Sequence, residues 1–182
     1  MTRPIINKSQ LLAKFRPSIV TAKVLTEARD ASWKDTRSDG RFDVFLSHSH
    51  IDKEIILAFS KMLNSTGLKV YIDWIVDKDR GGKTITAENA RIIRKRMKQC
   101  NTMIYLHTPN AAQSKWCPWE IGFFDAYRNE ISVALISDTI RSTTGQEYLE
   151  LYPRFKASVN SVTSKYSFKK QLTASSNEEY VF

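Results

Sequence analysis

One seven-residue stretch, residues 114–120, combines a carboxylate, two indole rings and the start of a helix. It reads Ser-Lys-Trp-Cys-Pro-Trp-Glu. Pro118 has a fixed φ angle and no backbone N–H, so it suits the first turn of a helix and predicts that a helix begins near it. Trp116 and Glu120 are four residues apart and therefore share one face of that turn. An aromatic ring beside a carboxylate is suited to holding a flat cationic group and to stabilising positive charge.

A second polar group follows a short apolar run. Residues 42–47, Phe-Asp-Val-Phe-Leu-Ser, are rich in strand-forming side chains and predict a buried strand. The polar run Ser47-His48-Ser49-His50 closes it and predicts a loop. Ser49 with Asp52 three residues later is the N-cap pattern that opens a helix, and Gly67 is expected near the end of that helix.

Strands and helices alternate along the rest of the chain. Further strands are predicted at 68–72, 102–107 and 131–136, and helices at about 86–98 and 114–128. Strands that are almost continuously apolar indicate a parallel sheet covered by helices on both faces, which is a doubly wound α/β fold. Ligands of such sheets bind beyond the carboxyl ends of the strands. Residues 47–50, the loop from Asp73 and residues 116–120 are therefore expected to meet along one edge.

The two ends of the chain differ from this pattern. Residues 1–40 predict a helical N-terminal extension, interrupted at Pro17 and closed by the turn signal Ser38-Asp39-Gly40. The main domain is predicted at 41–173, with a short element around 148–155 and one more helix at about 161–172. Residues 174–182 are predicted to be a polar tail.

Composition limits the classes of function. With 182 residues and 42% hydrophobic side chains, the chain predicts a globular domain, and no run approaches the roughly 20 apolar residues of a membrane span. We expect a cytoplasmic protein without a membrane partner, whose cysteines, Cys100 and Cys117, are free thiols. The net charge of +9 includes five cations within residues 91–98 and leaves nucleic-acid binding as an alternative. A solvated basic face is the more frequent explanation, so nucleic acid is not the expected partner.

Three motifs, taken in order, resemble the Toll/interleukin receptor (TIR) domain family. Residues 42–49 are similar to its first sequence box, and residues 68–83, with Gly81-Gly82, are placed like its BB loop. The strongest similarity is at 114–120, which resembles the family's S-x-W-C-x-x-E segment and the W-x-x-x-E pattern of bacterial members. The resemblance covers about residues 41–172 and implies a flavodoxin-like, doubly wound parallel sheet of about five strands.

The resemblance also implies an activity. Many TIR domains cleave NAD, and the glutamate of the W-x-x-x-E segment, here Glu120, is essential in them. By this likeness the chain is expected to be an NAD glycohydrolase or ADP-ribose cyclase of bacterial anti-phage defence, as in Thoeris-like systems, with NAD as substrate and no cofactor. Trp116, Ser47, His48 and Asp73 are the expected substrate-binding residues. Self-association through the BB loop, residues 73–83, and a separate effector that senses the product are the expected partners.

The chemistry of NAD is compatible with a single acid. The departing nicotinamide is already cationic on its ring nitrogen, so no general acid is needed and one carboxylate can replace the usual pair. Glu120 would stabilise the developing oxocarbenium charge. The acceptor is open at this point: water gives ADP-ribose, whereas a hydroxyl of the same molecule gives a cyclic product.

Other interpretations of these residues remain. Glu120 near a helix N-terminus could simply complement the helix dipole, and other TIR domains are scaffolds without activity, including effectors that act through TIR–TIR contacts. His48 and His50, with Asp52 beyond, are spaced for a metal, but loop histidines seldom bind one and no metal is expected. Gly82-Lys83-Thr84 resembles the end of a P-loop, but Asp77 stands where its first glycine is required.

Overall fold

The computed structural model describes residues 5–15, 40–72, 86–139 and 146–155. Its centre is a parallel four-stranded sheet in the order β2-β1-β3-β4. The strands are β1 (Phe42–Ser47), β2 (Val70–Ile72), β3 (Cys100–His107) and β4 (Ile131–Leu135). They are buried almost throughout, as expected of a parallel sheet covered on both faces. The predicted doubly wound α/β fold is confirmed.

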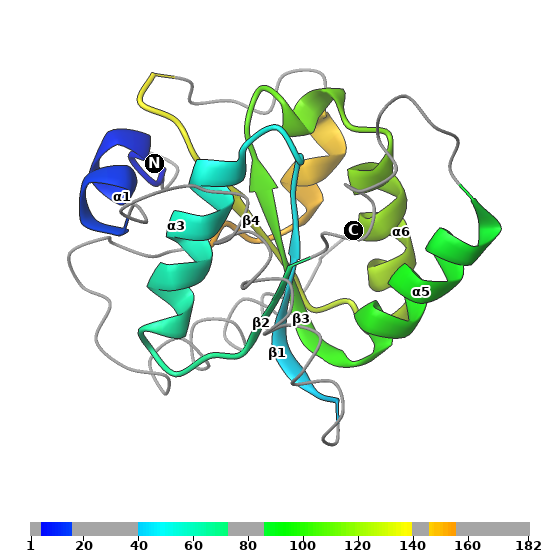
Figure 1. The fold of residues 1–182 in the computed structure, drawn as a ribbon. Coiled ribbons are helices and arrows are strands. Elements are labelled where there is room, and N and C mark those ends of the chain that lie inside the picture. The colour runs from blue at the N-terminus through cyan, green and yellow to red at the C-terminus, as the bar shows by residue number, and fades with distance from the viewer. Residues whose placement is uncertain (1–4, 16–39, 73–85, 140–145, 156–182) are drawn as a thin grey trace.

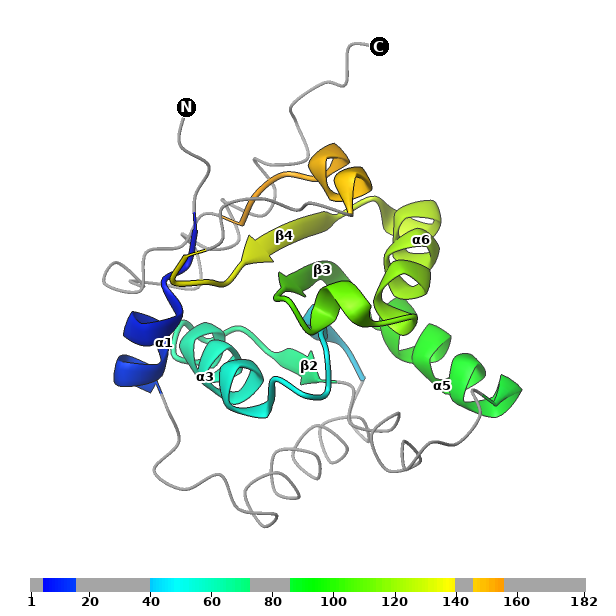
Figure 2. The same cartoon turned by 90° about the horizontal axis from the view of Figure 1, so that it is seen from above.

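Helices cover both faces of this sheet (Figure 1). On one face lie α1 (Lys8–Phe15) and α3 (Lys53–Asn64); on the other lie α5 (Ala87–Lys98) and α6 (Trp116–Arg128). The chain leaves β1 toward α3 and leaves β3 toward α6, so neighbouring strands send it to opposite faces. Figure 2 shows this divergence from above. A crevice for a ligand forms at such a switch point, beyond the carboxyl ends of the two strands.

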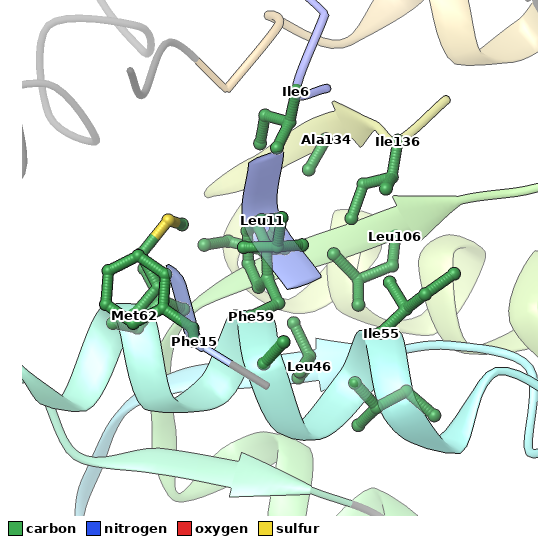
Figure 3. Packing of buried hydrophobic residues seen from close by; sticks show 14 of the residues in the cluster. Ile6, Leu11, Phe15, Leu46, Ile55, Phe59, Met62, Leu106, Ala134 and Ile136 are labelled. Carbon is green, nitrogen blue, oxygen red and sulfur yellow. The ribbon is translucent and has the colours of Figure 1, made fainter. Parts of the chain in front are cut away.

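Alternate side chains of the strands supply two separate cores. Leu46, Leu106 and Ala134 face α1 and α3, whereas Phe45, Tyr105 and Val133 face α5 and α6. The period of two follows from the pleat of a strand. Figure 3 shows the first core, in which strand residues pack against Ile55 and Phe59 of α3. Packing in both cores fixes the positions of the strand ends and of the polar residues that follow them.

The N-terminal helix is packed onto the first core. Leu11 and Phe15 of α1 are buried against α3, in the same cluster as Phe59 and Met62 (Figure 3). Ser9 donates from its backbone N–H and from its hydroxyl to the two carboxylate oxygens of Asp138, at 2.9 and 2.8 Å. The division at residue 40 remains a prediction, but residues 5–15 contribute to the domain core.

The described part of the chain has fewer strands than expected. Among the described residues the sheet has four strands rather than about five, and the outer edge of β4 carries only single parallel bridges. Arg154 bridges Val133, and Ile6 bridges Ile136. Short edge pairings of this kind still cover backbone groups that a bare edge would expose. The predicted element around 148–155 is the 3₁₀ helix η3 (Glu147–Leu151) followed by this bridge.

The predicted cap of α3 was also wrong in detail. The helix begins after Asp52, yet neither Asp52 nor Ser49 caps it with its side chain. The Asp52 carboxylate instead contacts residues after β3, because a tertiary partner competes with the local bond. Gly67 does end this segment, with a positive φ of 80° that favours glycine. The predicted helix at 161–172 and the tail lie outside the described residues.

No helix within the described ranges is long and apolar enough to cross a membrane.

Candidate active site

The Glu120 carboxylate lies at the carboxyl end of β1. Its Oε2 accepts a hydrogen bond from the Ser47 hydroxyl at 2.6 Å, and both residues are buried, with 5% and 1% of their surfaces exposed. This distance lies at the short end of the range for a hydroxyl hydrogen bond. The bond joins residues 73 positions apart in sequence. It confirms that the loop after β1 and the start of α6 meet at one edge of the sheet.

The local sequence fixes where α6 starts. The Ser114 hydroxyl accepts from the backbone N–H groups of Trp116 and Cys117, each at 3.3 Å, which satisfies two of the otherwise unpaired donors of a first turn. Pro118 lies within that turn, as predicted. Glu120 is the fifth residue of α6 and lies just beyond its first turn, which contains no acidic residue.

A second hydrogen bond joins the same two segments. The Cys117 thiol donates to the backbone carbonyl of His48 at 3.3 Å. His48 itself is oriented by Nδ1, which lies 2.7 Å from the carbonyl oxygen of Leu46. A carbonyl only accepts, so this contact requires a proton on Nδ1. Ser47 with Glu120, and His48 with Cys117, thus form two consecutive links between β1 and α6.

Trp116 is packed among other aromatic rings. Only 8% of its surface is exposed, and its ring meets that of Trp119 edge to face at 5.2 Å between centroids. The row continues along α6 through Phe123 and Tyr127. Core packing accounts for these contacts, and the role of Trp116 in stacking on a substrate remains a prediction.

Two residues of this region were not recognised in the sequence. The Tyr105 hydroxyl donates to Gln146 Oε1 at 3.0 Å, and Gln146 Nε2 donates to the carbonyl oxygen of Ala112 at 3.4 Å. Burial raises the pKa of Tyr105 far above its usual range, and the nearby Cys117, Tyr148 and Glu120 raise it further against the lowering effect of Gln146. The phenol therefore remains neutral. From the sequence, only the alternation of side chains along β3, which places Tyr105 on the same face of the sheet as Phe45 of β1, could have indicated Tyr105. No signal indicated Gln146.

The other features predicted from the sequence are the loop from Asp73, the absence of a metal site and the two thiols. Asp73 and the loop 73–83 lie outside the described residues. In the part of the chain that is described, no group of three His, Cys, Asp or Glu side chains could hold a metal ion. Cys100 and Cys117 are both buried and are not joined in a disulfide, and burial raises the pKa of the Cys100 thiol. Neither thiol is therefore predicted to be reactive.

The cations of α5 are partly engaged within the domain. The Arg94 guanidinium lies 5.9 Å from the Trp119 ring centre, and the Lys98 ammonium lies 5.7 Å from that of Tyr127. Arg96 is buried, over the Tyr71 ring. Such cation–π contacts give the basic residues a structural role that needs no nucleic acid.

Residues 44–162 match the TIR domain family, a range that includes both Ser47 and Glu120. The chain belongs to the TIR domain family. This TIR domain is 36% identical over 126 residues to a protein of Bacillus cereus (strain MSX-D12) named probable 3′ cyclic ADP-D-ribose synthase ThsB′. That match covers 68% of this chain and 65% of the relative.

A second relative, from Cytobacillus dafuensis, is named putative cyclic ADP-D-ribose synthase TIR2. It is 29% identical over 83 residues, which cover 45% of this chain and 22% of the relative. The TIR domain thus spans about two thirds of the first relative's length and about a fifth of the second's.

Proposed function

We propose that this TIR domain cleaves NAD at the bond between nicotinamide and ribose and closes the ADP-ribose part into a cyclic product. Two relatives that are named as synthases of cyclic ADP-D-ribose support the proposal. The observation that carries it is the Glu120 carboxylate held by Ser47 at the carboxyl end of β1, where doubly wound sheets bind ligands. NAD is here the substrate, and no redox cofactor is needed.

The demanding step of the proposed reaction is the cleavage of the bond between ribose and nicotinamide. As the bond from the ribose C1′ to the nicotinamide nitrogen breaks, its electron pair passes to the pyridinium ring, which leaves neutral, and positive charge develops on the sugar. The Glu120 carboxylate stabilises that charge, and its burial strengthens the attraction because water screens it less. A hydroxyl oxygen of the same molecule then bonds to C1′ and releases its proton to solvent. We assign to Ser47 the task of fixing the carboxylate during this step.

Other parts of the proposal rest on the family resemblance. Trp116, His48 and Asp73 are proposed to contact the substrate, with Trp116 stacking on nicotinamide or ribose. The loop 73–83 of a neighbouring copy is proposed to complete the site, and a separate effector to sense the product. Cytoplasmic location and a role in anti-phage defence belong to the same proposal.

Incubation of the purified protein with NAD tests the activity. Release of nicotinamide and the mass of the second product are measured for the wild type, Glu120→Gln and Glu120→Ala. Glu120→Gln keeps the shape of the side chain and removes its charge, so the rate is expected to fall by roughly a hundredfold or more. Glu147→Gln, an exposed glutamate of η3, is the matched control and should retain the wild-type rate.

Two results decide between the alternatives. A product that has lost nicotinamide without gaining water is cyclic, whereas one that has gained water is linear ADP-ribose. If the wild type releases no nicotinamide, even under crowded conditions that promote assembly, the protein is better described as a scaffold. Thermal unfolding of each variant shows whether a lost rate reflects lost folding.

A further inference from the structure

Asp52, the residue before α3, connects the loop after β1 to the loop after β3. Its Oδ2 accepts a short hydrogen bond from the Thr108 hydroxyl, and its Oδ1 accepts from Asn110 Nδ2 at 2.7 Å. Both oxygens of the carboxylate are thus used across 56 and 58 positions of sequence. The contact accounts for the missing side-chain cap of α3.

The loop that Asp52 holds leads directly into the candidate active site. Thr108 Oγ1 also accepts from the backbone N–H of Ala111 at 3.0 Å, which starts the 3₁₀ helix η2 (Ala111–Gln113). The next residue, Ser114, provides the hydroxyl that accepts from the first two backbone N–H groups of α6. A series of hydrogen bonds therefore leads from the Asp52 carboxylate through Thr108 and η2 to Ser114 and the first N–H groups of the helix that carries Glu120.

The same short element is held from its other side. Gln146 donates to the carbonyl oxygen of Ala112 in the middle of η2 and accepts from Tyr105 of β3. Tyr105 and Gln146 are both buried. Asp52 holds η2 from the side of α3, and the pair formed by Tyr105 and Gln146 holds η2 from the side of η3. The position of η2 is thus determined from two directions.

We propose that Asp52 is a positioning residue for Glu120 and Trp116. It fixes η2, and through η2 the start of α6, relative to the end of β1. The idea rests on the proposed function, because it assigns the consequence of a misplaced carboxylate to catalysis. A small displacement of a catalytic group by a distant substitution is enough to lower the rate of a chemical step substantially.

The donor and acceptor pattern allows a sharp set of variants. Asp52→Ala removes both acceptors, and Asn110→Asp places a second carboxylate against the first. The double variant Asp52→Asn/Asn110→Asp exchanges the two groups: the new amide donates to the new carboxylate and still accepts from Thr108. Thr108→Val keeps the shape of the side chain but removes both the donor to Asp52 and the acceptor for the Ala111 N–H, and Thr108→Ser, which keeps the hydroxyl, is its matched control.

Two measurements are made on each full-length variant. For nicotinamide release, Asp52→Ala and Asn110→Asp are expected to lower kcat by about tenfold or more while KM stays within about threefold. The exchanged double variant and Thr108→Ser should return kcat to within about threefold of the wild type. Amide hydrogen exchange should rise over residues 111–121 in the disrupted variants but not over β4, since a merely structural loss would loosen both regions.

Each outcome bears on one of the two claims. An unchanged kcat in Asp52→Ala and Asn110→Asp, or a double variant no better than Asn110→Asp alone, overturns the positioning role. If the wild type releases no nicotinamide, the proposed function fails, and hydrogen exchange still judges the positioning of α6. Selective exchange over residues 111–121 then supports it, and uniform or unchanged exchange overturns it.

Discussion

Replacing Ser47 with alanine removes one atom that contacts the proposed catalytic carboxylate. The hydroxyl donates to Glu120 Oε2 at 2.6 Å, and both side chains are buried. A hydrogen bond to a charged group contributes about 1.5–3 kcal/mol. If that free energy holds the carboxylate in its productive orientation, kcat should fall by about ten- to a hundredfold, since about 1.4 kcal/mol corresponds to a factor of ten.

The same substitution has a cost in stability that must be separated from the effect on the rate. A buried acceptor that loses its donor costs about 1–3 kcal/mol of unfolding free energy, or roughly 2–12 °C in the midpoint for a chain of this size. Ser60→Ala is the control, because Ser60 is similarly buried but belongs to α3, where its hydroxyl accepts from Asn64 at 3.4 Å. Nicotinamide release and thermal unfolding are measured for both variants.

Three patterns of result are distinguishable. A loss of kcat in Ser47→Ala that is absent from Ser60→Ala supports the fixing of the carboxylate. A rise in KM at constant kcat indicates instead that Ser47 touches the substrate, which is the role that the family resemblance implies. A loss of stability with kcat within about twofold of the wild type would refute both roles and leave the bond a purely structural one.

Two further predictions concern the N-terminal helix. Leu11→Ala, at a fully buried position, should lower the unfolding free energy in urea by about 2–5 kcal/mol, whereas Leu12→Ala, at a partly buried position of the same helix, should cost clearly less; equal losses would contradict the packing of α1 on α3. Hydrogen bonds from Ser9 lower the pKa of Asp138, so this carboxyl stabilises the fold above its unfolded pKa of about 3.9 and loses that contribution as the pH falls through the lower folded value. Asp138→Asn should therefore flatten the decline of the unfolding midpoint below about pH 4, and an unchanged decline would show that the bond contributes nothing.

The order of elements could be predicted because each one has a local signal. The continuous apolar runs predicted all four strands to within about two residues, and Pro118 placed the first turn of α6. The edge of the sheet could not be predicted in this way. Arg154 and Ile6 pair with β4 only through single bridges, which require no strand-like run in the sequence.

The candidate site was predictable to the level of segments and not of contacts. Topology alone requires the end of β1 and the start of α6 to meet, and the bond between Ser47 and Glu120 shows that they do. Which partner each polar group takes depends on positions far apart in the chain. Asp52 looked like part of a helix cap because its sequence neighbours fit that pattern, yet residues 56 and 58 positions away bind its carboxylate.

The sequence motif 114–120 is therefore only one part of the candidate site. The stretch 114–120 supplies the carboxylate, the helix start and the Cys117 bond to the His48 carbonyl, but residues outside it also hold the carboxylate and the start of α6. That is done by Ser47 from β1, by Asp52 through η2, and by Gln146 through the other side of η2. Substitutions at these three residues leave the motif intact, and we expect them to change the orientation of Glu120. A TIR domain can therefore retain the W-x-x-x-E pattern and still differ in activity because of residues outside it.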